Sequence, residues 1–307
     1  MTDILYDTVI IGAGAAGLTA GIYASRANMK SILFEKFAPG GQAALTAFVE
    51  NYPGFPDGVS GFDLMEKMRS QAVKYGLEIK TAEVTSFTQD THDFSLETTA
   101  GEIRTKTIII CTGVRPRHLG IPGEKELFGK GISTCATCDG AFYRNLEVAV
   151  IGGGDSALDE GIYLTRFASK VHIIHRRDTF RAIGPLVVKA EHDPKIQFHL
   201  DTIVTAVNGE NSVESVTLKN VRTGEESVLP VSGVFLYVGL LPNSEMFREF
   251  IKLNDQGFIK ADEILATSVP GVFAAGDVRE TPLRQIITAA SDGALAAHSA
   301  GKYVETI

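Results

Sequence analysis

The feature that most constrains the fold is a glycine-rich motif that occurs twice, each time between an apolar run and a helix-forming segment. In the first copy, the apolar run at residues 6–11 leads into residues 12–17 (GAGAAG), and Glu35 ends the next apolar run. Such glycines allow a tight turn and the close approach of backbone to a pyrophosphate. A carboxylate at the second strand end can accept hydrogen bonds from ribose hydroxyls. This predicts a βαβ dinucleotide-binding unit, and the alternative is a glycine-rich turn in an α/β core.

The second copy differs from the first where the nucleotide ribose would lie. Residues 152–157 (GGGDSA) follow the apolar run at 146–151, and the next strand ends in His175, Arg176 and Arg177. Arginines can bind a 2′-phosphate through charge-assisted hydrogen bonds, whereas an acid would repel it. The first site is therefore expected to prefer FAD or NAD and the second NADP. The alternative for the second site is a solvated basic strand end. Together the motifs predict an α/β fold with two Rossmann-like, three-layer ββα domains.

Between the two motifs lies the segment Cys135-Ala-Thr-Cys138-Asp139-Gly, whose CxxC spacing suits a redox dithiol or half of a zinc site. The chain has three cysteines, which is no disulfide framework and is typical of a reducing compartment. Structural zinc needs four ligands, usually from two such pairs, and Cys111 is the remaining cysteine. The redox dithiol is therefore the favoured interpretation, with no metal, and Cys111 is expected to be a buried thiol at a strand end.

Charge and hydropathy exclude two classes of partner. The formal net charge of −8 argues against binding a nucleic-acid backbone, which depends largely on Lys and Arg. No apolar run approaches the roughly 18 residues needed to cross a bilayer. The N-terminus carries Asp3 and Asp7 and lacks a basic region followed by an apolar stretch, so no signal peptide is expected. These features predict a cytoplasmic protein without a membrane partner.

The final third of the chain holds two further candidates for a flavin site. Gly276 and Asp277 follow an apolar strand, and this carboxylate could bond the ribityl hydroxyls or the pyrophosphate region. The alternative for Asp277 is a helix N-cap. The last helix is expected to begin near Arg284 and Gln285, where its positive dipole could stabilise a reduced, anionic flavin.

Taken in order, these motifs resemble those of bacterial-type, low-molecular-weight thioredoxin reductases, the class II pyridine nucleotide-disulfide oxidoreductases. The matching stretches are GAGAAG at Gly12, GGQ at Gly40, ENYPG at Glu50, CTGVRPR at Cys111, CATCDG at Cys135, GGGDSA at Gly152, HRRDTFRA at His175, GVFAAGDV at Gly271 and RQ at Arg284. They extend over almost the whole chain. Departures are small: Cys111 stands where alanine is usual, and Leu283 stands where an aromatic residue is common.

The resemblance implies a discontinuous FAD-binding domain at residues 1–115 and 246–307, an NADPH-binding domain at 116–245, and a homodimer. The implied FAD-binding residues are Gly12, Gly14, Ala15, Ala16, Gly17, Glu35, Lys36, Gly41, Gln42, Asn51, Thr112, Gly113, Gly276, Asp277, Arg284, Gln285 and Ile286. The implied NADPH-binding residues are Gly152, Gly153, Gly154, Asp155, Ser156, His175, Arg176, Arg177 and Arg181.

The implied activity is that of a thioredoxin-disulfide reductase. NADPH would reduce FAD, FAD would reduce the Cys135–Cys138 disulfide, and the dithiol would reduce thioredoxin by thiol–disulfide exchange. Following the family, Cys138 is expected to be the sulfur nearer the flavin. Asp139 is a candidate general acid or base, and its alternative role is a helix N-cap. Nicotinamide and dithiol would reach the flavin alternately, by domain rotation on connections near residues 114–118 and 242–246.

Two other functions fit the same motifs. The enzyme could be an NAD(P)H-dependent reductase that serves a peroxiredoxin or a dedicated thioredoxin-like protein, because the dithiol and both nucleotide sites would look alike. A chain of another class, a non-catalytic flavin-binding redox sensor, would bind the flavin without turnover. Rapid anaerobic bleaching of the flavin by NADPH would separate a reductase from a sensor.

Overall fold

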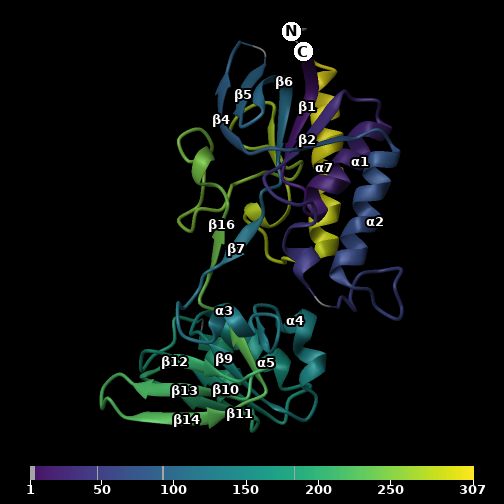
Figure 1. The fold of residues 1–307 in the computed structure, drawn as a ribbon. Helices are drawn as coiled ribbons and strands as arrows, with labels where there is room; N and C mark the ends of the chain where they lie inside the picture. Colours follow the sequence, from purple (N-terminus) through teal and green to yellow (C-terminus); the bar gives the residue numbers. More distant parts are fainter. Residues whose placement is uncertain (1–3, 47, 92, 183) are drawn as a thin grey trace. The chain divides into compact units, whose positions relative to one another are not determined.

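The computed structural model describes residues 4–46, 48–91, 93–182 and 184–307, so Asp3 lies outside the described residues. The chain divides into two compact units, one formed by Met1–Arg115 with Leu241–Ile307 and the other by Pro116–Leu240 (Figure 1). The chain thus returns to the first unit at Leu241, earlier than the expected residue 246. None of the helices that the structure describes combines the length and apolar character needed to cross a membrane.

The first unit is built on a mixed sheet that has seven strands among the described residues, in the order β3-β2-β1-β6-β5-β4, with β17 also paired to β6. Strands β1, β2, β3, β6 and β17 run parallel, whereas β4 and β5 extend the sheet as an antiparallel meander. The strands are β1 (Leu5–Ile11), β2 (Ser31–Glu35), β3 (Glu78–Thr81), β4 (Val84–Gln89), β5 (Phe94–Thr98), β6 (Gly101–Ile110) and β17 (Val272–Ala274). The helices are α1 (Ala15–Arg26), α2 (Gly61–Lys74) and α7 (Ile286–Val304).

Alternate residues of the central strands enter two separate cores, as expected for a sheet that is covered on both faces. Ile10 of β1 packs on the helix side with α1, α2 and α7, while Val9 and Ile11 pack on the opposite side with Phe87 and Phe247. Small residues on α1 and α7 let these helices approach closely: a Cβ at Gly293 would lie 2.0 Å from the Ala16 carbonyl oxygen.

The second unit repeats this plan with a parallel sheet in the order β11-β10-β9-β15-β8 and a separate antiparallel sheet in the order β12-β13-β14. Helix-side and opposite-side cores again receive alternate residues, with Val150 facing α5 and Ile151 facing the antiparallel sheet. The strands are β8 (Ile132–Ser133), β9 (Glu147–Ile151), β10 (Lys170–Ile174), β11 (Ile196–His199), β12 (Thr202–Asn208), β13 (Ser215–Asn220), β14 (Glu226–Pro230) and β15 (Gly233–Leu236). The helices are α3 (Glu124–Leu127), α4 (Ala136–Asp139), α5 (Asp155–Leu164) and α6 (Gly184–Glu191). The two three-layer α/β units confirm the predicted fold class.

A two-stranded ribbon of β7 (Val114–Pro116) and β16 (Leu240–Pro242) joins the units. Just beyond it, Asn243 binds the first unit through three hydrogen bonds. Its backbone N–H donates to the Gly113 carbonyl (3.0 Å), its side-chain amide donates to the Thr112 carbonyl (2.8 Å), and its own carbonyl accepts from the Thr112 hydroxyl (2.6 Å). Arg115 adds bonds to the Asn243 side chain and the Glu245 carboxylate (2.7 and 2.6 Å). These bonds are why residues 241–245 belong to the first unit.

Candidate functional site

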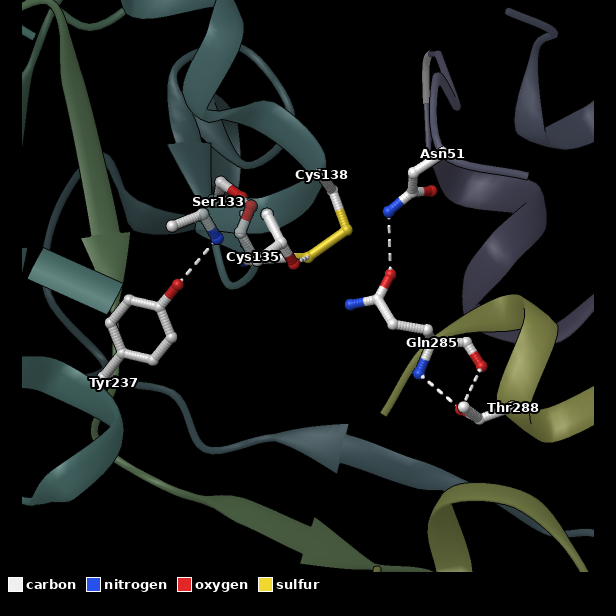
Figure 2. Close-up of a disulfide and its surroundings, with 9 residues drawn as sticks. Asn51, Ser133, Cys135, Cys138, Tyr237, Gln285 and Thr288 are labelled. Atoms are coloured by element: carbon white, nitrogen blue, oxygen red, sulfur yellow. Dashed lines mark hydrogen bonds between the residues drawn. A yellow bond between two sulfur atoms is a disulfide. The ribbon is translucent and has the colours of Figure 1, made fainter. Parts of the chain in front are cut away.

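The dithiol segment forms a disulfide between Cys135 and Cys138 at the start of the short helix α4. The Ser133 hydroxyl accepts a hydrogen bond from the Cys135 backbone N–H (3.0 Å), and the Thr137 hydroxyl lies 3.3 Å from the Cys135 sulfur. The Tyr237 hydroxyl accepts a hydrogen bond from the backbone N–H of Ala136 (2.7 Å) (Figure 2). The predicted CxxC pair therefore lies in a turn whose backbone is fixed by two side chains.

Asp139 adjoins Cys138 and makes no side-chain capping bond at the short 3-10 helix that follows it. Burial raises the pKa of the Asp139 carboxyl above its ordinary value, and a hydrogen bond from Ser133 partly opposes this shift. Burial also raises the pKa of Tyr143 to about 12, and the charge of Asp139 adds to this shift. A carboxyl with a raised pKa beside a dithiol can hold a proton and release it to a thiolate.

In the first unit, the loop of residues 12–14 connects β1 to α1, and the glycine motif has little space for side chains. Gly12 has φ +103°, and a Cβ there would lie 2.5 Å from the Cys111 carbonyl oxygen. A Cβ at Gly17 would lie 1.8 Å from the Gly12 carbonyl oxygen, so glycine alone lets α1 start this close to the loop. Glu35 at the end of β2 accepts a hydrogen bond from the Ala13 N–H (2.8 Å). The acid therefore reaches the loop from the neighbouring strand.

Two distant turns lie against this loop. Gly40 donates its N–H to the Ala13 carbonyl (2.8 Å), and a Cβ at Gly41 would lie 3.2 Å from the Gly14 Cα. A Cβ at Gly276 would lie 3.0 Å from the Ala16 Cβ. Three of the predicted stretches, far apart in sequence, thus converge on the N-terminus of α1.

Asp277 and Arg284 are partly buried in the same unit, and each influences the charge of the other. Burial raises the pKa of Asp277 to about 6, with Arg284 opposing this shift and Asp292 adding to it. The Arg284 guanidinium lies over the Phe258 ring, 4.4 Å from its centroid, and its buried Nε has no hydrogen-bond partner among the described residues. A buried donor without a partner is costly and is expected to meet a ligand atom.

The other predicted residues of the first unit are placed as follows. The Asn51 side-chain amide donates to the Gln285 side chain (3.0 Å) at the start of α7, where Gln285 and Thr288 form a capping box (Figure 2). Lys36 is exposed and pairs with Glu83 (2.7 Å), so the structure does not bring its amine to the loop. Ile286 is the first residue of α7, Gln42 lies in a short 3-10 helix (Gly41–Leu45), and Thr112 and Gly113 contact Asn243.

In the second unit, the loop of residues 152–154 connects β9 to α5, which begins at Asp155 and Ser156. The His175 ring is buried directly under this loop: a Cβ at Gly153 would lie 2.2 Å from it, and His175 Nε2 lies 3.1 Å from the Thr179 carbonyl oxygen. Burial lowers the pKa of His175. This histidine therefore supports the loop from below, which the sequence did not indicate.

The three arginines that follow are exposed on the second unit. Arg181 contacts the loop through its backbone N–H, which donates to the Gly153 carbonyl (2.7 Å). Its guanidinium also lies 4.0 Å from where a Gly154 Cβ would stand. The neighbouring Asp178 pairs with Arg222 (2.5 Å), which lowers the pKa of Asp178. The acid within the HRRD segment is thus neutralised by another residue, which leaves the charge of Arg176, Arg177 and Arg181 in excess.

Both loops fit a dinucleotide on structural grounds. Among the described residues, and apart from its own chain neighbours and helix backbone, no heavy atom lies within 4 Å of where a Gly14 Cβ would stand. A Cβ at Gly154 would likewise meet only Arg181 at that limit. Neither α1 nor α5 has a side-chain hydrogen bond at its N-cap. Open space over an uncapped helix N-terminus is what a pyrophosphate requires. In the first unit Ala13, Gly14 and Arg284 would hold the group, and in the second Gly153, Gly154 and Arg181.

Sequence reasoning missed three residues that support these sites. Asp292 accepts the Gly276 N–H (3.0 Å) and binds Arg279 (2.6 Å), which fixes the turn at Asp277. Tyr237 and Glu160 contact the dithiol turn. All three act across long sequence separations, and no local pattern marks them.

Comparison with known proteins identifies the family. The model of the pyridine nucleotide-disulphide oxidoreductases matches residues 6–293. Thioredoxin reductases of Treponema pallidum and Bacillus subtilis are 46% and 45% identical over 302 and 304 residues. These alignments cover 98% of this chain and 98% of the first relative, and 99% of this chain and 96% of the second.

Solved structures agree with this result. The crystal structure of thioredoxin reductase from Streptococcus pyogenes is 41% identical with a TM-score of 0.94, covering 100% of both chains. That of Lactococcus lactis thioredoxin reductase is 44% identical with a TM-score of 0.69, covering 98% of this chain and 100% of the other. With its two dinucleotide loops and the disulfide on the second unit, the chain belongs to the pyridine nucleotide-disulphide oxidoreductase family.

Proposed function

We propose that this chain is a thioredoxin-disulfide reductase that uses FAD and NADPH. The observation that carries this proposal is the Cys135–Cys138 disulfide, which lies in the same unit as a dinucleotide loop flanked by three arginines. Members of the family use FAD and NADPH. When bound, FAD carries electrons from NADPH to the disulfide.

The chain's own residues divide this task between the two units. FAD binds in the first unit, at the motif of residues 12–17, the turn at Gly41, Asp277 and Arg284. NADPH binds in the second unit, at the loop of residues 152–154 with Arg176, Arg177 and Arg181. The remaining residues implied by the resemblance, apart from Lys36, belong to the same two sites. Arg284 supports the FAD site because its buried Nε, which has no partner among the described residues, is a hydrogen-bond donor available to the cofactor.

At the dithiol, the resemblance implies that Cys138 would exchange electrons with the flavin, and one of the two thiolates then attacks the partner disulfide. This exchange forms a mixed disulfide with thioredoxin, which the second thiolate resolves, so that thioredoxin leaves as a dithiol and the enzyme disulfide returns. Asp139 exchanges the proton, consistent with its raised pKa. We further propose that the enzyme works in the cytoplasm as a homodimer.

A coupled assay of NADPH oxidation against a panel of disulfide substrates tests this function. The panel includes thioredoxins, dedicated thioredoxin-like proteins and a peroxiredoxin. Rapid turnover with thioredoxin, abolished in Cys135→Ser and Cys138→Ser, is the expected result. If the enzyme prefers a peroxiredoxin or a dedicated thioredoxin-like protein, that protein is its substrate in place of thioredoxin. If NADPH fails to bleach the flavin under anaerobic conditions, the chain is a redox sensor and not a reductase.

A further inference from the structure

The backbone between the two cysteines is bonded to side chains from two other elements of the second unit. Ala136 donates its N–H to the Tyr237 hydroxyl (2.7 Å). The Glu160 carboxylate lies beside the Thr137 N–H and the Tyr237 hydroxyl, and both of these donors act to lower its pKa. A hydroxyl has one proton, so Tyr237 accepts from Ala136 and donates to Glu160. Tyr237 and Glu160 thus lie next to each other and to the backbone of the dithiol turn.

Rigid elements place both side chains. Glu160 lies on α5, the helix whose first residues face the nucleotide loop, and Tyr237 directly follows β15. The Tyr237 N–H donates to the Ile151 carbonyl (2.8 Å), which anchors it beside β9. The second carboxylate oxygen of Glu160 is buried and has no hydrogen-bond partner among the described residues.

An acid in this position is unfavourable for folding, which suggests that it serves the chemistry. Burial raises the pKa of Glu160 and the nearby charge of Asp159 adds to this, while the bonds from Tyr237 and Thr137 oppose it. Burial likewise raises the pKa of Tyr237. Leucine or methionine would fill the same space without an unpartnered oxygen.

We propose that Glu160 and Tyr237 are positioning residues for the redox dithiol, which hold its turn in place and set its thiol acidity and reduction potential. This inference rests on the proposed function, since it concerns the same disulfide. A carboxylate beside the backbone that joins the two cysteines opposes the formation of a thiolate on them. The reduced state is then stabilised less, so the dithiol gives up its electrons more readily.

The potential can be measured on the holoenzyme without thioredoxin. In a dithiothreitol redox buffer, the enzyme disulfide and dithiothreitol exchange to give the enzyme dithiol and the cyclic disulfide of the reagent. Acid quenching, thiol labelling and mass spectrometry of the peptide with Cys135 and Cys138 give the reduced fraction. Glu160→Gln should shift this equilibrium at pH 8 toward the dithiol by about tenfold, which is ~30 mV for a two-electron couple.

The acidity of the thiols is a second measurable property, and the two variants are expected to change it in opposite directions. We expect Glu160→Gln to move the pH midpoint of iodoacetamide alkylation of the reduced dithiol down by about one unit, because the opposing charge is lost. Tyr237→Phe leaves that carboxylate with one donor fewer, so its midpoint should move up by about half a unit. A merely structural role would not move the two variants in opposite directions.

Asp159→Asn is the matched control, since it removes the same charge from the neighbouring, exposed position on α5. Its potential and midpoint should equal those of the wild type. Unchanged values in both Glu160→Gln and Tyr237→Phe, or equal shifts in Asp159→Asn, would overturn the proposal. If the wild type fails to reduce thioredoxin, the proposed function fails while these measurements still decide the role of Glu160 and Tyr237.

Discussion

At the scale of single residues, the buried Asp277 carboxyl ties stability to pH. Its pKa is raised to about 6 from an ordinary value of 3.8, chiefly by burial. Between these values the folded chain binds more protons than the unfolded chain, so stability must fall as pH rises through this window. The free energy of unfolding is expected to fall by up to about 3 kcal/mol across this window because of Asp277.

Asp277→Asn should therefore flatten the pH dependence of stability in the FAD-free protein. We expect the wild type to lose unfolding free energy from pH 4 to pH 6 relative to the variant, as measured by urea titration at several pH values. Asp255→Asn, which alters an exposed carboxyl of the same unit, is the control. Parallel pH profiles for wild type and Asp277→Asn would contradict the assigned pKa.

The exposed arginines decide which nicotinamide cofactor is used. Replacing Arg176 and Arg177 together by alanine should lower kcat/KM for NADPH by about 100-fold, because each charge-assisted bond to a 2′-phosphate is lost. The value for NADH should change by no more than about threefold. Arg166→Ala, which removes an exposed arginine of the same unit outside residues 175–181, is the control and should leave the preference intact. Equal losses for both cofactors would refute the assignment.

At the scale of elements, the start of α1 separates what glycine does for folding from what it does for binding. A Cβ at Gly17 would meet a backbone carbonyl that cannot yield, whereas a Cβ at Gly14 would stand in open space. Gly14 has φ −75°, which alanine adopts without strain. The first glycine is needed for packing, and the second leaves room for the cofactor.

Gly17→Ala should destabilise the FAD-free protein by about 3 kcal/mol, because α1 must move away from its loop. Gly14→Ala should change that stability by only a few tenths of a kcal/mol yet weaken FAD binding at least about tenfold, since the methyl group occupies the path of the pyrophosphate. Urea unfolding of the FAD-free proteins and FAD titration provide the two measurements. A Gly14→Ala protein that binds FAD as tightly as the wild type would place the pyrophosphate elsewhere.

The elements also show how far sequence reasoning extends. Gly12, Gly17 and the CxxC pair were predictable because glycine spacing and cysteine spacing have local physical causes. The sequence predicted His175 at a strand end, but its burial under Gly153 depends on how β10 packs against the loop. Glu160 and Tyr237 gave no sequence signal, since their partners lie 23 and 101 residues away. The return of the chain to the first unit at Leu241 differs from the expected residue 246, and the Thr112–Asn243 bonds that hold residue 243 there have no sequence signature.

At the scale of the whole molecule, the arrangement of sites over two units sets a mechanical requirement. The dithiol and the arginine cluster both belong to Pro116–Leu240, while the predicted flavin residues belong to the other unit. The chain crosses from one unit to the other in the β7–β16 ribbon. Because one flavin must serve both the nicotinamide and the dithiol, we propose that the second unit rotates about this ribbon during each turnover.

Joining the units covalently should then abolish turnover while sparing single steps. Engineered cysteine pairs, one exposed residue on each unit, can be bridged by a photocleavable bismaleimide in the oxidised enzyme. The native thiols will not react, because Cys135 and Cys138 form a disulfide and Cys111 is buried with a raised pKa. In stopped-flow experiments, the bridged enzyme should retain either flavin bleaching by NADPH or dithiol–flavin exchange. Its steady-state rate of thioredoxin reduction should fall at least about 100-fold. Illumination, which cleaves the bridge, should restore that rate. Bridges placed within one unit are the control, and full turnover by the inter-unit bridged enzyme would exclude rotation.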